Sequence, residues 1–77
     1  MVNWKEHIVF DPGVLYGKPI IRNTRIPVDL ILDKLSEGES LEEILESYPH
    51  LEREDLYAAL AFASYAIKNE IVYDLAS

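Results

Sequence analysis

The stretch PVDLILDKLSEGESLEEILESYP, residues 27–49, decides the fold of this chain, because it contains two amphipathic helices and the signals that separate them. Apolar residues recur at helical spacing in both halves, at Val28, Ile31, Leu32 and Leu35 and again at Leu41, Ile44, Leu45 and Tyr48. Gly38 suits the position just after a helix. Ser40 and Glu43 form the pattern of a capping box. The stretch predicts helices over about residues 28–37 and 41–48.

Toward the C-terminus, the pattern predicts a third helix over about residues 53–68. It begins near Arg53, with Glu54 and Asp55 favourable in its first turn. Its middle is apolar on most sides, so it must be covered on most sides. Two interpretations stay open: an uncovered face binds a partner or a second copy, or the N-terminal residues fold over it.

Toward the N-terminus, residues of about 7–27 predict a short β-arm and not a full sheet. Ile8-Val9-Phe10 is β-branched and aromatic, and turn signals follow at residues 11–13 and 17–19. Asn23-Thr24 stands between two short apolar runs and could close a two-residue hairpin, because asparagine tolerates a positive φ. We therefore expect a mainly α fold in one domain, residues 1–77: a β-arm or hairpin followed by three helices.

Composition narrows the class of protein. The 77 residues have a net charge of −7 and no cysteine. Residues 1–27 hold four cations and two carboxylates, whereas residues 28–77 hold three cations and twelve carboxylates. Phosphate backbones repel such an acidic body, so nucleic acid would have to meet the N-terminal third. The sequence shows neither a signal peptide nor a membrane span, and we expect a cytoplasmic protein.

The sequence contains no recognisable catalytic motif, and we expect neither an enzyme nor a bound cofactor, metal or small-molecule substrate. It has no nucleophile elbow, phosphate-binding loop or dinucleotide fingerprint. His50 and Glu54 lie four residues apart, but a metal site needs three or four donors. The glutamates of the second helix are interpreted as a solvated face, with the docking of a basic partner as the alternative.

A small set of polar residues is a candidate for contact with DNA. Its members are Lys18, Arg22, Thr24, Arg25 and Arg53. The two arginines of the arm have a second interpretation, in which they pair with Asp29 or Asp33 and lock the arm onto the first helix. We favour that structural interpretation, and we expect Thr24 to be a turn residue.

A second set, on the third helix and beyond it, is a candidate for contact with a partner protein. Its members are Phe62, Tyr65, Ile67, Lys68, Ile71, Tyr73 and Leu75. For the chain end, residues 70–77, three interpretations stay open: contact with a partner, an extension of the helix packed on its own domain, and disorder.

The run GKPIIRNTRIPV, residues 17–28, resembles the "GKPVIRGTRIPV" signature of domain-of-unknown-function family 433. The likeness continues through Leu41-Glu42-Glu43-Ile44 and Tyr48-Pro49-His50-Leu51 and covers roughly residues 7–66. Asn23 replaces the glycine of the pattern but preserves the turn. The resemblance implies a helix-turn-helix, homeodomain-like arrangement. It also implies an antitoxin encoded beside a PIN-like ribonuclease toxin, which it binds and inhibits, with repression of its own operon as a further role.

Three functions follow from these observations. The first is the antitoxin implied by the resemblance. The second is a stand-alone DNA-binding regulator, although the third helix, with two acids near its start and apolar residues beyond, is poorly suited to reading bases. The third is a homo-oligomeric interaction module, such as a homodimer. We favour the first.

Overall fold

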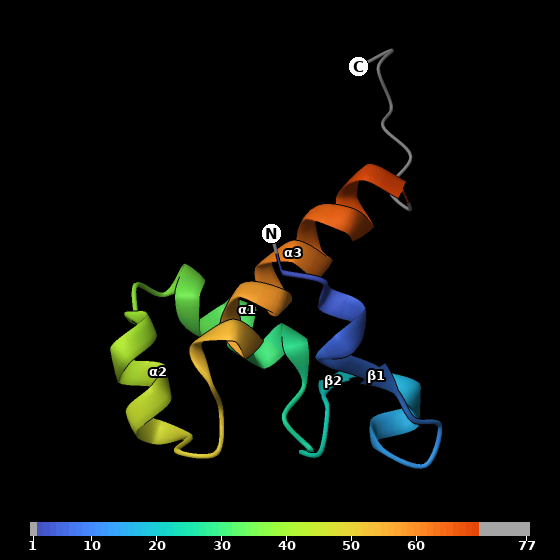
Figure 1. Ribbon diagram of the computed structural model, residues 1–77, viewed down its shortest axis with the longest axis horizontal. Coiled ribbons are helices and arrows are strands. Elements are labelled where there is room, and N and C mark those ends of the chain that lie inside the picture. Colours follow the sequence, from blue (N-terminus) through green and yellow to red (C-terminus); the bar gives the residue numbers. More distant parts are fainter. Residues whose placement is uncertain (1, 70–77) are drawn as a thin grey trace.

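Three helices and a short hairpin make up the fold of the computed structural model, which describes residues 2–69 (Figure 1). The helices are α1 (Val28–Ser36), α2 (Leu41–Ser47) and α3 (Arg53–Asn69). Each end lies within one residue of the range predicted from periodicity and capping. The expected mainly helical fold, with a hairpin in front of three helices, is confirmed.

Local signals explain the ends of the first two helices. The Ser40 hydroxyl accepts the N–H of Glu43 at 3.1 Å, and the Glu43 carboxylate accepts the N–H of Ser40 at 2.8 Å. This reciprocal capping box begins α2. Gly38 follows α1 with a φ of 96°, a conformation that glycine adopts without strain. The chain can therefore reverse between α1 and α2.

The core lies where the three helices meet the hairpin. Each helix contributes a large, fully buried aliphatic side chain, namely Ile31, Ile44 and Leu56, and α1 adds Val28. The hairpin adds Ile8 and Ile21, which face each other across its strands. Burial of each such side chain contributes about 1.5–3 kcal/mol, so these residues dominate the stability of the domain.

The hairpin joins segments that are farther apart in the sequence than we predicted. Strand β1 (Ile8–Phe10) pairs antiparallel with β2 (Pro19–Ile21). The predicted hairpin at Asn23-Thr24 is instead a wider turn, closed by the Ile21 N–H, which donates to the Ile26 carbonyl at 2.9 Å. After this turn the chain pairs with β2 by a single isolated bridge, between Ile20 and Pro27. The pairing does not continue because Pro27 has no N–H to donate and leads into α1.

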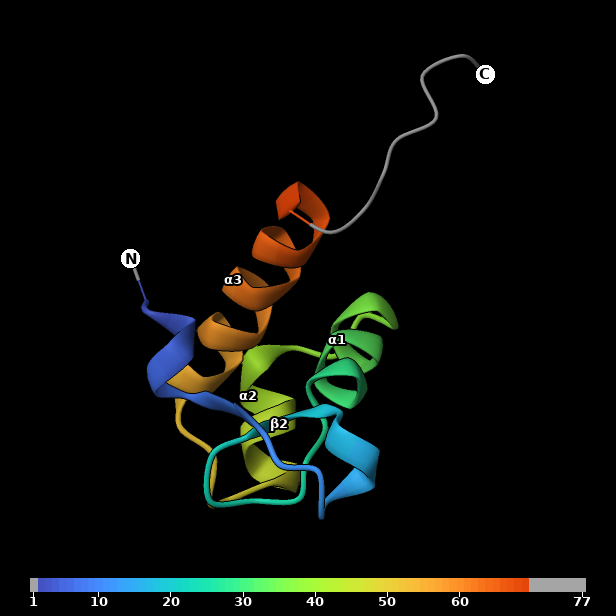
Figure 2. The same ribbon diagram turned by 90° about the vertical axis from the view of Figure 1, so that its right-hand side faces the viewer.

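The N-terminal segment packs along one side of α3, with a 3₁₀ turn, η1 (Trp4–Glu6), ahead of β1. The Trp4 ring lies 5.0 Å from the Phe62 ring, edge-on, and 5.2 Å from the Tyr65 ring. In Figures 1 and 2 the C-terminal half of α3 extends beyond the other elements. The N-terminal arm therefore covers one side of the helix, as the second interpretation expected, and another side stays exposed.

Candidate functional site

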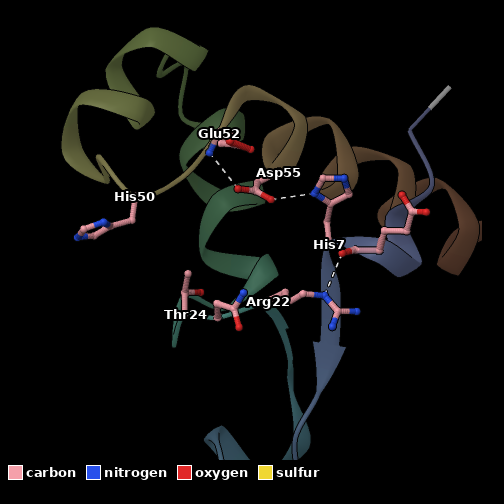
Figure 3. Close-up of a pocket in the computed structure, with 8 residues that line it drawn as sticks. His7, Arg22, Thr24, His50, Glu52 and Asp55 are labelled. Atoms are coloured by element: carbon pink, nitrogen blue, oxygen red, sulfur yellow. Dashed lines mark hydrogen bonds and ion pairs between the residues drawn. The ribbon is translucent and has the colours of Figure 1, made fainter.

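A polar pocket lies at the N-terminal end of α3, where three separate segments meet (Figure 3). Asp55 is at its centre. One oxygen of its carboxylate is 2.9 Å from Nδ1 of His7, and the other accepts the N–H of Glu52 at 2.9 Å. The second bond satisfies a free amide at the start of α3. Asp55 therefore caps the helix and holds the N-terminal segment at the same time.

Arg22 fastens the N-terminal segment from the other side of this pocket. Its Nε donates to the carbonyl of Glu6 at 2.9 Å, and its Nη2 donates to the carbonyl of Lys5 at 3.3 Å. Among the residues that the structure describes, no bond joins Arg22 to Asp29 or Asp33, so the predicted partners were wrong. The guanidinium fork of Arg22 does bind two oxygens, but these belong to backbone carbonyls and not to carboxylates. For Arg25 the expected pairing is wrong, since within residues 2–69 it makes no ion pair.

Thr24 is a turn residue, as we expected. Its hydroxyl donates to the carbonyl of Ile21 at 2.7 Å and accepts the N–H of Ile26 at 3.0 Å. Asn23 precedes it with a φ of 64°. Asparagine tolerates this left-handed conformation better than most residues do, which explains how it can stand where the resembled pattern has glycine.

Two more of the DNA-binding candidates are held in ion pairs. Lys18 is 3.1 Å from Asp29, and Arg53 is 3.0 Å from Glu42. The second pair raises the pKa of Arg53; that of Glu42 is lowered first by the hydrogen bond from its own backbone N–H and then by Arg53. Arg25 is exposed and makes no bond within residues 2–69.

An apolar groove runs along the exposed part of α3, beside the N-terminal segment. Its lining includes Val2 and Trp4 from that segment and Ala61 and Tyr65 from α3, with Lys68 at the end near the C-terminus of α3. Tyr65 is 40% exposed although its ring contacts Trp4. Between Tyr57 and Asn69, Lys68 is the one charged residue of α3. The groove can therefore offer apolar contact with a single cation at its end.

The family described as "Protein of unknown function (DUF433)" matches residues 8–63. The chain belongs to the DUF433 family. A relative, the uncharacterized protein y4eO of Sinorhizobium fredii, is 34% identical over 59 residues, which are 77% of this chain and 27% of that protein. The chain thus spans about a quarter of the length of that relative.

A DUF433 member from Anabaena variabilis, known from a crystal structure, is 42% identical to this chain. The two structures superpose with a TM-score of 0.69 over 80% of this chain and 58% of that one. The range that matches the family, residues 8–63, includes most of the polar pocket of this DUF433 domain. Six groove residues lie outside it: Val2, Trp4, Ser64, Tyr65, Lys68 and Asn69.

The partner-binding candidates fall into three groups. Phe62 packs against the core and against Trp4 and Phe10, so most of its contacts are within the domain. Tyr65, Ile67 and Lys68 are exposed on α3. Ile71, Tyr73 and Leu75 lie outside the described residues. We did not predict Trp4 as a site residue; an isolated tryptophan close to the chain end was the available signal.

Neither a group of metal-ligating side chains nor a membrane-spanning helix is found in the described part of this DUF433 domain. Within residues 2–69, no three histidine, aspartate or glutamate side chains are grouped as metal ligands. His50 points away from the His7–Asp55 pair in Figure 3, although it lines the same pocket. Over the same residues, no helix has the length and the apolar character needed to cross a membrane.

Proposed function

We propose that this DUF433 domain is an antitoxin, which binds and inhibits a PIN-like ribonuclease. The observation that carries the proposal is the open apolar groove between Trp4 and α3. Exposed aromatic side chains beside a lysine favour binding of a protein over binding of nucleic acid, because tyrosine and tryptophan bring large contact areas at a small cost in entropy. The family resemblance supplies the kind of partner.

The contacts that the cationic side chains already make favour a protein partner over DNA. Of the five DNA-binding candidates, Lys18 and Arg53 are neutralised by carboxylates, and Arg22 is engaged by backbone carbonyls. Thr24 has both its donor and its acceptor in use inside the turn. Binding to phosphates would have to break these contacts or rely on Arg25, and a single arginine gives little affinity.

The acidic character of the domain fits a ribonuclease in particular. A ribonuclease binds a polyanion, so the surface that receives RNA must carry positive charge. The exposed side of α2 carries Glu42, Glu43 and Glu46. An acidic protein that docks by its groove and places these carboxylates near the substrate surface would exclude RNA by competition.

The test is purification of the tagged chain from its native host, followed by identification of the proteins that co-elute. We expect a ribonuclease in stoichiometric amount, inactive on RNA until the antitoxin is removed. Tyr65→Glu, which places a charge in the groove, should release the enzyme. Arg25→Ser, on the far turn, is the matched control and should leave the complex intact. Recovery without any nuclease would contradict the proposal.

Repression of its own operon is the second part of the proposed role, and it depends on the complex. The acidic domain alone should not shift its own promoter DNA even at low salt, whereas a complex with a cationic nuclease should. A shift by the isolated domain, lost in Arg25→Ser, would favour the stand-alone regulator instead.

A further inference from the structure

A second exposed surface of α3, which adjoins the groove, has the spacing of a coiled-coil seam. Tyr57, Leu60, Ser64 and Ile67 follow one another at intervals of three, four and three residues. This alternation places side chains on one narrow stripe of a helix. Tyr57 is 41% exposed, Leu60 45% and Ile67 46%, and Ser64 is also exposed. The stripe is called the α3 seam below.

Such a seam is built to pack against another helix. Large apolar side chains exposed at this spacing fit between the side chains of a facing helix, as knobs fit into holes. No other helix of the described chain lies over the seam, because the buried residues of α3, Leu56, Ala58 and Ala59, face the core from the other side. The seam is therefore available to a helix from another molecule.

The charged residues beside the seam indicate which kind of helix can pack against it. Glu54, Ala61 and Lys68 are spaced seven residues apart and so follow the same edge of the seam. Glu54 and Lys68 are both exposed, and neither makes an ion pair within residues 2–69. One end of the edge is thus acidic and the other is basic, about 21 Å apart along the helix axis.

We propose that the occupant is α3 of a second copy of this chain, packed antiparallel. In that orientation the acidic end of each helix faces the basic end of the other, so that Glu54 and Lys68 pair twice across the two-fold axis. Leu60 of each copy then packs over Ser64 of its partner, a large side chain over a small one. In a parallel pair this edge would face the other edge of the partner helix, which carries Leu56 and Ala63, so Glu54 and Lys68 would meet no opposite charge.

The dimer does not rest on the proposed antitoxin function, although the seam and the groove share Ser64. Leu60 belongs to the seam, and Tyr65 belongs to the groove. A variant of one surface can therefore fail while the other surface still binds.

The test is the mass of the full chain in solution by light scattering and sedimentation. We expect a dimer. Leu60→Glu buries an unpaired charge in the seam and should weaken dimerisation at least about 30-fold. Tyr65→Glu is the matched control and should leave the dimer unchanged. A monomer at every concentration, or a dimer that is unaffected by Leu60→Glu, overturns the proposal.

The orientation is tested by charge exchange. Glu54→Lys and Lys68→Glu should each weaken the dimer roughly tenfold, since each variant turns two attractive pairs into repulsive ones. Mixing the two variants should restore association, because a heterodimer then has opposite charges at both ends. Circular dichroism checks that both variants are folded. A mixture no tighter than the single variants overturns the antiparallel arrangement.

Discussion

Two sides of α3 have the same secondary structure and opposite surroundings. On the side that faces the core, Leu56 is fully buried, and Asp55 in the first turn has both carboxylate oxygens in hydrogen bonds. Away from the core, Leu60, Tyr65 and Ile67 remain two-fifths or more exposed. Exposure of this much apolar surface is tolerated because the buried side anchors the helix. The contrast teaches that the buried side holds the fold and that the exposed side is available for binding.

The largest expected effect separates two leucines that lie four residues apart. Leu56→Ala should lower the free energy of unfolding by about 2–5 kcal/mol, because it leaves a cavity in the core. Leu60→Ala removes the same atoms from an exposed position and should cost less than about 1 kcal/mol. Urea unfolding of the two variants, at a concentration where the chain is monomeric, checks this. Equal losses would mean that the two sides of α3 do not differ as described.

The next effect concerns the polar anchor. Asp55→Ala removes the bonds to His7 and to the Glu52 N–H and should cost about 1–3 kcal/mol. Glu52→Ala keeps the backbone N–H that Asp55 binds, so this control should stay near the wild-type value. A double-mutant cycle of Asp55→Ala with His7→Ala isolates the contact between the two side chains. If the cycle gave no coupling energy, Asp55 would act as a helix cap alone.

A smaller effect is expected in the turn below the pocket. Thr24→Val keeps the volume of the side chain but loses both hydrogen bonds of the hydroxyl, at a cost of about 1–2 kcal/mol. Arg25→Ser, one residue away and fully outside the network, should be neutral. Thermal unfolding of both variants measures the difference. Destabilisation by Arg25→Ser would show that the arginine has a structural role.

The smallest effect is the response to acid at the junction of α2 and α3. Because the pKa of Glu42 is lowered in the folded state, its contribution to stability is present above the unfolded value of 4.5. That contribution is lost as the pH falls through the folded pKa. Glu42→Gln should therefore reduce the loss of stability between neutral and acidic pH. Unfolding curves across that interval test it, and an unchanged slope would contradict the assignment.

The helices could be predicted from the sequence because their signals are local. The stripes of α1 and α2, the Ser40–Glu43 capping box and the glycine at position 38 each act within a few residues. The turn role of Thr24 was predictable for the same reason, since its partners Ile21 and Ile26 are near neighbours.

The contacts that build the pocket and the groove could not be predicted, because they join distant parts of the chain. His7 meets Asp55 across 48 residues, and Trp4 meets Tyr65 only once α3 has formed. The pairing of β1 with β2 depends on a connection in which Leu15 and Tyr16 have φ values of 51° and 58°. Non-glycine residues rarely adopt this conformation, and their sequence gives no sign of it.

Trp4 is the one tryptophan of the sequence, and it stands at the rim of the groove. The fluorescence emission of an indole depends on the water around it, so the emission of Trp4 depends on whether the groove is open to water. Excitation of this single ring will record when the groove is filled, without any label. Because the seam shares Ser64 with the groove, comparing this signal in Leu60→Glu and in Tyr65→Glu tells a bound copy from a bound partner.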